Sequence, residues 1–591
     1  MRRDEQKIED TWDLSSIYKD RNAWEKDLKK IAKDAKNAVK FKGHAAESSD
    51  SLFSMLTFIE DAYKRAESVS SYAFLSYAAD GSDRDAQTML ALAEDAINRL
   101  SSALSYFEPE LLKADEKEIK KYIKEKKFKP FKTYVERILS EKKHILGESE
   151  EKLLSYYAPL SGQFDDAFGD LNDIDMDFGE VRGEKLTHGT FQKFLKDEDR
   201  SIRKEAYEKL YDQYEKHQHV IAKLYAGSVK SDIFKAKARG YKSSLERALE
   251  PDRIPEKLYR NLIKEIHNAF PILHRFYEVK KRVLGVDKLQ HYDVYMPLAK
   301  SKEGNYPYQK GVEIIRNALR PLGDEYVSTL VEGLTTGRWV DKYENKGKQS
   351  GAFSSGGYKG KPYILTNYED SLISSVFTLI HEGGHSMHSY YSVRNNPFLS
   401  YSYTIFEAEV ASTFNERLLA EYLLKNESDK EMRKFLISKE LDDIVATLFR
   451  QTMFAEYELV MHEDAENGIP VTIAHIREVY GKLLREYFGP DVGFEETSDL
   501  EALRIPHFYR AFYVYKYASG ISAAIALSKR VLSGGEKERN EYLSFLKSGG
   551  SRYPLSSLKM AGVDMSTGEA VKMAVEHFKS RLEEFEALLD Q

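Results

Sequence analysis

The spacing of apolar residues along the chain is helical for most of its length. Between residues 20 and 170, apolar side chains return every three to four positions in successive stretches, for example at 51–66 and 85–107. This is the period of an amphipathic helix. A polar break that contains glycine, at residues 80–84, separates these two stretches and favours a turn. The pattern therefore predicts a mainly α-helical protein.

Two departures from this pattern separate the first part of the chain from the rest. Residues 174–186 alternate between apolar and polar positions and contain glycines, which favours a β-hairpin. An acidic start at 197–201 then opens a long helix that we expect to continue toward Lys237. We therefore expect an N-terminal helical lobe at residues 1–195 and a second lobe at residues 196–591.

An apolar stretch at 372–380 leads directly into the sequence His-Glu-Gly-Gly-His at 381–385. On a helix, His381 and His385 lie one turn apart on the same face, so both imidazoles can reach one metal ion. Glu382 lies beside them and can act as a base toward water that zinc has made acidic. Chance produces this spacing about 0.06 times in a chain of this composition. The alternative, a solvated helix with two histidines, fits the apolar stretch poorly, because buried polar groups need partners.

A catalytic zinc site usually has a third protein ligand and one open position. Residues 404–416 form a second predicted helix, which carries Glu407, Glu409 and Glu416. Glu409 and Glu416 are seven residues apart and share a face, so one could bind the metal while the other holds a histidine ring. His388 is a weaker alternative ligand, because three rings from successive turns of one helix converge poorly on one ion.

A segment rich in glycine and serine precedes the histidines. Residues 351–358 are a donor-rich loop, and residues 361–366 have the composition of a short strand. An extended peptide could pair along the edge of this strand through its main chain, which would tolerate many sequences. A purely structural hairpin is the alternative interpretation.

Composition narrows the class of protein. The 591 residues are 42% apolar, which is enough for a large buried core. The net charge is 89 − 96 = −7, and no basic block is dense enough to indicate a nucleic-acid surface. The chain has no cysteine for a disulfide framework, its start lacks the apolar core of a signal peptide, and no apolar run approaches the roughly 20 residues of a membrane span. We therefore expect a cytoplasmic protein that binds neither nucleic acid nor membrane.

Segments spread over nearly the whole chain carry recognisable motifs. They lie at residues 11–18, 351–368, 381–391, 505–520, 545–551 and 558–565. Together they resemble the thimet oligopeptidase-like (M3) family of zinc metallopeptidases, in particular its oligoendopeptidase F group. The resemblance implies a large helical zincin-type fold with a deep substrate channel, a small β-hairpin or sheet element near the active site, and a catalytic lobe at residues 196–591.

The resemblance also assigns the remaining ligand. In that family, the third zinc ligand is a glutamate in a Glu-x-x-Ser setting downstream of the two histidines. Glu409, with Ser412 three residues later, fits this setting, whereas Glu407 does not. The resemblance therefore implies Glu409 as the third ligand.

The family also uses a histidine and tyrosines of the C-terminal segment to hold the substrate carbonyl and its developing negative charge, which implies His507. Tyr509, Tyr513 and Tyr517 repeat every four residues and would share a helix face, whereas Tyr515 points elsewhere. We therefore assign the donor role to Tyr513 and Tyr517.

The sequence as a whole predicts a zinc-dependent endopeptidase that hydrolyses internal bonds of short, unstructured oligopeptides. One zinc ion would be bound by His381, His385 and Glu409, and Glu382 would assist the attack of water. A zinc exopeptidase or amidohydrolase built on the same helix is one alternative. The other is a non-catalytic, helical peptide-binding protein with a structural metal, although a closed structural site has no use for a base such as Glu382.

Overall fold

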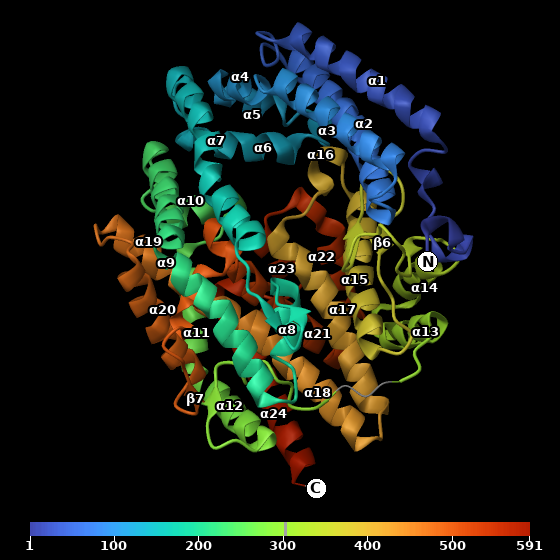
Figure 1. The fold of residues 1–591 in the computed structure, drawn as a ribbon. Coiled ribbons are helices and arrows are strands. Elements are labelled where there is room, and N and C mark those ends of the chain that lie inside the picture. The colour runs from blue at the N-terminus through green and yellow to red at the C-terminus, as the bar shows by residue number, and fades with distance from the viewer. Residues whose placement is uncertain (301–303, 591) are drawn as a thin grey trace. The chain divides into compact units, whose positions relative to one another are not determined.

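The computed structural model describes residues 1–300 and 304–590 of the chain. Helices account for most of these residues, and their strands form small sheets of two or three strands (Figure 1). The mainly helical fold expected from the sequence is therefore confirmed. Within the described residues, no helix combines the length and the apolar character needed to cross a membrane.

The chain divides into two compact units, each of which combines three separate stretches. Unit 1 consists of Met1–Lys143, Glu303–Lys425 and Ala526–Val563, and unit 2 consists of His144–Lys302, Asn426–Ile525 and Asp564–Gln591. The lobes expected from the sequence divide the chain only once, near residue 195. This division remains a prediction.

Unit 1 is helical apart from one small sheet. Its helices are α1 (Arg21–Ala38), α2 (Ser49–Ala79), α3 (Arg84–Leu104), α4 (Phe107–Lys113), α5 (Glu116–Tyr122), α6 (Lys132–Ser140), α13 (Tyr308–Ala318), α14 (Asp324–Leu334), α15 (Ile373–Asn395), α16 (Phe398–Tyr401), α17 (Ile405–Asn426), α22 (Glu536–Ser548) and α23 (Pro554–Met560). The helix α15 packs along α22, while α1, α2 and α3 pack on one another.

The helices expected near the N-terminus are confirmed as α2 and α3. The polar break between them supplies the residues that end one helix and begin the next. The Asp83 side chain accepts a hydrogen bond from the Asp85 backbone N–H at 2.8 Å, which satisfies a donor that the first turn of α3 leaves without a helical partner.

The sheet of unit 1 has the strand order β4 (Val340–Asp341), β6 (Tyr363–Leu365), β5 (Phe353–Ser355). The strand expected at 361–366 is confirmed as β6, which pairs parallel with β4 and antiparallel with β5. The expectation that a peptide pairs along this strand is therefore wrong, because both edges of β6 are occupied. The outer edge of β5 has no strand beside it among the described residues.

Unit 2 contains the longest helix among the described residues, and its strands have two residues each. Its helices are α7 (Glu148–Asp170), α8 (His188–Phe194), α9 (Arg200–Ala238), α10 (Ser244–Leu249), α11 (Glu256–Asn268), α12 (Phe270–Leu284), α18 (Lys430–Ile444), α19 (Arg450–Glu466), α20 (Ile473–Phe488) and α24 (Glu569–Leu589), together with the first part of α21 (Tyr515–Ser533), which ends in unit 1. Two short strands, β3 (Leu289–Gln290) and β7 (Val492–Gly493), pair parallel.

The long helix and the hairpin expected in this region are both confirmed. The side chain of Asp199 accepts a hydrogen bond from the Ser201 N–H at the start of α9. The hairpin is shorter than the sequence pattern suggests, since β1 (Glu180–Val181) and β2 (Glu184–Lys185) have two residues each. Gly179, with positive φ, precedes the first strand, and Arg182 and Gly183, both with positive φ, form the two-residue turn between the strands, as type I′ hairpin turns require.

Candidate metal centre

The helix α15 of unit 1 brings the two histidines of the motif to one place. Apolar side chains in the turns before the motif, such as Phe377 and Ile380, are buried and hold the helix in the interior of its unit. The rings of His381 and His385 follow one turn apart, with 4.9 Å between their centroids. Both rings are partly exposed, in contrast to the buried turn before them.

Glu409 of α17 faces these two rings. Its Oε2 atom lies 3.6 Å from Nε2 of His381 and 3.7 Å from Nε2 of His385. The ligand atoms of the three residues all lie within 4.8 Å of one another. Ligands about 2.0–2.1 Å from a tetrahedral zinc are about 3.4 Å apart, so this donor set fits a zinc ion with little movement.

A glycine makes the close approach of α15 and α17 possible. A Cβ atom added at Gly384 would lie 2.6 Å from the carbonyl oxygen of Ala411 and 2.6 Å from the Cα atom of Ser412. Both neighbours are backbone atoms of α17, which cannot rotate away as a side chain can. At Gly383 the nearest atoms belong to the Leu330 side chain, at 3.3 Å. The second glycine of the motif therefore sets the distance between the helix with the histidines and the helix with Glu409.

Glu416, two turns beyond Glu409 on α17, is hydrogen-bonded to Nδ1 of His381. Burial lowers the pKa of His381, but Glu416 and two further glutamates outweigh this effect and raise it to about 9. The metal-free ring is therefore protonated on both nitrogens near neutral pH, and metal binding must displace the Nε2 proton. Glu416 accepts the remaining Nδ1–H and so favours the tautomer whose free Nε2 can bind a metal.

Glu382 lies on α15 with 7% of its surface exposed. Burial is the main reason that its pKa rises to about 7, and a hydrogen bond from the Ser354 backbone of β5 opposes this rise. The Ser354 hydroxyl in turn contacts the hydroxyl of Ser386 at 2.8 Å. The carboxyl group of Glu382 is therefore beside strand β5 and has the pKa of a group that can exchange a proton near neutral pH.

The other two residues considered as ligands lie elsewhere in unit 1. Glu407 is fully buried, and its Oε2 atom accepts hydrogen bonds from the backbone N–H and the hydroxyl of Thr404, at 3.3 and 3.2 Å. His388 is fully buried and stacks on Tyr403, with 3.6 Å between ring centroids. Burial lowers the pKa of His388 to about 3. Neither residue belongs to the group formed by His381 and its neighbours.

His507, Tyr513 and Tyr517 lie in unit 2 and form a cluster there. The ring of His507 is 6.1 Å from that of Tyr513 and 6.2 Å from that of Tyr517, and the two tyrosine rings are 5.5 Å apart. His507 is half-buried, and burial together with nearby Arg510 lowers its pKa. The three side chains predicted from this segment of the sequence are thus close enough together to contact one chemical group of a substrate.

The expectation that Tyr509, Tyr513 and Tyr517 share one helix face is wrong. Tyr509 belongs to the 3-10 helix η12 (Pro506–Tyr509), and α21 does not begin until Tyr515. The backbone of Phe512 has φ = +59°, which no α-helix allows. Tyr509 instead stacks on Phe168 of α7 at 4.6 Å. The local backbone, rather than a helical repeat, brings Tyr513 and Tyr517 together.

Two features of unit 1 were missed in the sequence. Strand β5 lies beside Glu382, but three residues between glycines show no alternation that would reveal a strand. The atoms that lie 2.6 Å from a Cβ added at Gly384 belong to α17, which begins more than 20 residues later in the sequence. The pair of glycines inside a helical pattern was the available signal, because glycine weakens a helix and is retained there for a packing or functional reason.

The sequence and the fold of the chain are similar to those of known proteins. The sequence model of "Peptidase family M3" matches residues 193–577, and that of the N-terminal part of "Oligopeptidase F" matches residues 110–178. An oligoendopeptidase F homolog of Borreliella burgdorferi is 42% identical over 98% of both chains, and the oligopeptidase PepF of Bacillus subtilis is 40% identical over 99% of this chain and 88% of its own. The crystal structure of oligoendopeptidase-F from Enterococcus faecium superposes with a TM-score of 0.76 at 33% identity, over 96% of this chain and 98% of that one.

Proposed function

Because the chain belongs to the oligoendopeptidase F group of peptidase family M3, we propose that it is a zinc-dependent endopeptidase of short, unfolded oligopeptides. Membership of this family makes the chain a metallopeptidase that hydrolyses oligopeptides. The identity of the metal, the cleavage of internal bonds and the roles of individual residues are the parts proposed here.

One observation carries the proposal. The Nε2 atoms of His381 and His385 lie 3.6 and 3.7 Å from Oε2 of Glu409, and the three ligand atoms lie within 4.8 Å of one another. Two histidines and one glutamate are a common ligand set of catalytic zinc and leave one coordination position open. The buried carboxyl group of Glu382 lies on the same helix, next in sequence to the first ligand. This combination supports hydrolysis rather than a structural metal site.

Zinc in such a site polarises the scissile carbonyl and lowers the pKa of water from 15.7 to about 7. Glu382 would take the proton from the attacking water and deliver it to the departing amine. Burial of the Glu382 carboxyl group raises its pKa, which favours its holding the proton between the two steps. Glu416 would keep Nε2 of His381 available to the metal throughout.

The outer edge of β5 is the proposed support for the substrate main chain. The strand adjoins Glu382, and its partner β6 occupies only one of its two edges. A peptide that adds to an edge strand is held through backbone hydrogen bonds and must be extended. A folded protein would first have to unfold locally, which supports short, unfolded peptides as the substrate class.

His507, Tyr513 and Tyr517 would supply the hydrogen bonds that hold the substrate carbonyl and its developing negative charge. Preorganised donors stabilise this charge more than they stabilise the ground state. The support for this role is the clustering of one imidazole and two phenol groups in unit 2, together with the family to which the chain belongs.

The proposal is tested by metal content and by turnover, measured separately. Removal of metal by a chelator should abolish cleavage of a quenched oligopeptide, and zinc should restore it. Glu382→Gln should bind zinc as tightly as the wild type and lose at least about 1,000-fold in kcat, because it keeps the size of the side chain but not the base. Full activity of the metal-free protein, or of Glu382→Gln, would refute the mechanism.

Mass spectrometry of the products tests the cleavage of internal bonds. A mixed library of peptides should yield fragments of several lengths from both ends. Release of single residues from one terminus would instead establish a zinc exopeptidase. A folded protein offered at the same concentration should remain intact, and should be cleaved only after it has been unfolded.

A further inference from the structure

The loop that leads to Tyr513 contains an unusual backbone conformation. Phe512 lies between η12 and α21 with φ = +59° and has 2% of its surface exposed. Positive φ is uncommon outside glycine and is a clear outlier for a bulky residue. Such a conformation persists only when the surrounding structure holds it, and it often marks a functional segment.

One side chain holds the backbone of this residue directly. The N–H of Phe512 donates a hydrogen bond of 3.0 Å to Oε1 of Glu458. Glu458 is fully buried on α19, so no water competes for the bond. The anchor comes from a separate helix, more than 50 residues earlier in the sequence.

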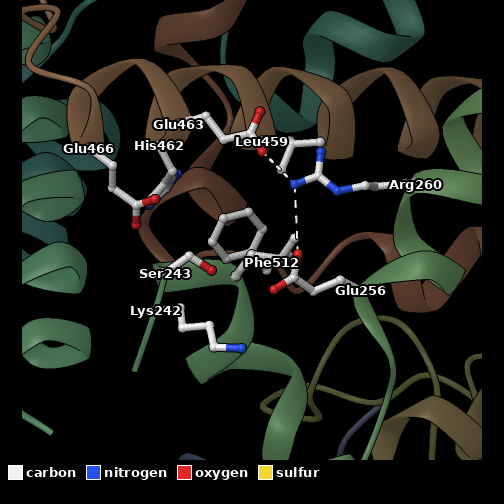
Figure 2. A pocket seen from close by; sticks show the side chains of 10 residues that line it. Lys242, Ser243, Glu256, Arg260, Leu459, His462, Glu463, Glu466 and Phe512 are labelled. Atoms are coloured by element: carbon white, nitrogen blue, oxygen red, sulfur yellow. Dashed lines mark hydrogen bonds and ion pairs between the residues drawn. The ribbon is translucent and has the colours of Figure 1, made fainter. Parts of the chain in front are cut away.

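The ring of Phe512 is also fixed by its neighbours. It lies 4.7 Å from the ring of His462 and 5.8 Å from that of Tyr259, between centroids. Figure 2 shows this ring below α19, among the side chains that line a cavity. The cavity has a volume of about 230 Å³, and Arg260 and Glu463 also line it. The backbone of Phe512 is thus bonded to α19, and its ring packs between α19 and Tyr259 of α11.

The second oxygen of the Glu458 side chain, Oε2, has no hydrogen-bond partner among the described residues. Burial is the largest reason that its pKa is raised well above the usual range, and no Lys or Arg contributes to this shift. A buried carboxyl group without a cation is unfavourable for folding. The hydrogen bond that the Glu458 side chain accepts from the Phe512 N–H is therefore the interaction that best accounts for a carboxyl group at this position.

Tyr513 follows Phe512 directly, so the conformation at Phe512 sets the direction in which Tyr513 leaves the loop. With φ = +59° at Phe512, the ring of Tyr513 lies 6.1 Å from that of His507 and 5.5 Å from that of Tyr517. A negative φ at Phe512 would rotate the backbone that follows it and turn Tyr513 to another side.

We propose that Glu458 is a positioning residue, which holds Phe512 in the left-handed conformation and thereby fixes Tyr513 beside His507 and Tyr517. The proposal rests on the function proposed above for Tyr513. It adds a residue that touches neither substrate nor metal but on which the geometry of the donors depends.

Three variants of α19 test the anchor. Glu458→Gln keeps an oxygen acceptor of the same size, whereas Glu458→Leu keeps the volume and removes the acceptor. Glu463→Leu is the control, because Glu463 lies on the same helix but pairs with Arg260. Kinetics on a quenched oligopeptide, zinc content and amide hydrogen exchange of residues 510–514 are measured for each.

We expect Glu458→Leu to lower kcat about 10- to 100-fold, since a donor misplaced by about 1 Å can cost a factor of 100. KM should change by less than about threefold and zinc content should not change. Exchange of the 510–514 amides should become faster. Glu458→Gln and Glu463→Leu should both remain within about twofold of the wild type. Wild-type kcat and exchange in Glu458→Leu would overturn the proposal.

A double-mutant cycle separates this role from general stability. Tyr513→Phe removes the phenol donor, so adding Glu458→Leu to it should cost less than a further threefold in kcat. If the second change costs as much in that background as it does alone, Glu458 does not act through Tyr513. Full activity of Tyr513→Phe would refute the function proposed for Tyr513, while faster exchange in Glu458→Leu would still establish the anchor.

A second substitution covers the case in which Glu458→Leu does not fold. Glu458→Ala also removes the acceptor, but it leaves an empty volume instead of a branched side chain. Its kcat should fall at least about fivefold with zinc content unchanged. Wild-type kcat in this variant would also overturn the proposal.

Discussion

The contact between α15 and α17 at Gly384 makes the sharpest prediction about the metal centre. An alanine at this position would put its Cβ atom 2.6 Å from backbone atoms of Ala411 and Ser412. Ordinary contacts begin at 3.4 Å, so the two helices must separate by about 3.4 − 2.6 = 0.8 Å. Glu409 is carried by α17 and would move with it. Its oxygen would then leave the position that matches the two histidines.

The size of the effect follows from this displacement. Metal–ligand distances tolerate changes of about 0.2 Å, which is a quarter of the required movement. Overpacking of an interior typically costs about 1–3 kcal/mol. If strain of this size is imposed on the metal-binding arrangement, zinc affinity falls about 5- to 150-fold, at about 1.4 kcal/mol for each factor of ten.

The assay is a zinc titration in competition with a coloured chelator, with kcat/KM on an oligopeptide as the second measurement. Gly383→Ala is the matched control, since it adds the same methyl group one residue earlier and meets only the Leu330 side chain at 3.3 Å. It should bind zinc within about threefold of the wild type, because a leucine side chain can shift by a few tenths of an ångström. Equal zinc affinity in Gly384→Ala and Gly383→Ala would refute the argument that this glycine sets the position of Glu409.

Two other substitutions test one interaction in unit 1 and one in unit 2. In unit 1, Glu416→Ala should weaken zinc binding about 10- to 100-fold in the same titration, because His381 loses the carboxylate that fixes its tautomer; unchanged affinity would contradict this. In unit 2, burial lowers the pKa of His291 to about 4, so the folded state favours the neutral ring. The stability this contributes is complete above pH 6.5 and is lost as pH falls toward 4, by about 2 kcal/mol between pH 7 and pH 5. Chemical denaturation at both pH values should show this loss in the wild type and not in His291→Gln, and an equal loss in both would assign it to other groups.

The parts of the site that sequence predicts well are those fixed by local geometry. The spacing of His381 and His385 needs only one turn of helix, and the apolar residues before them are enough to place that helix in the interior. The helix with Glu409 and Glu416 was also predictable, and their spacing of seven residues places both on one face of that helix. The choice among the carboxylates needed the resemblance to a family, because the period alone allows more than one.

The parts that the sequence did not predict depend on residues far apart in the chain. Strand β6 lies between two others, although its own composition does not distinguish an edge from a centre. The repeat of tyrosines suggested one helix, but the hydrogen bond from Phe512 to Glu458 holds the backbone outside the helical region. Such tertiary contacts override a local periodic pattern, and no window of neighbouring residues contains them.

The open edge of β5 has a consequence for how the protein behaves in a crowded solution. An unpaired strand edge can join the edge of any other exposed chain and so begin aggregation. The length of β5, at Phe353–Ser355, is only three residues, and a glycine with positive φ lies two residues before it. An edge this short limits the number of backbone hydrogen bonds available to a second copy of the protein. The edge is therefore a poor template for fibres, which is compatible with the peptide-binding role proposed for it.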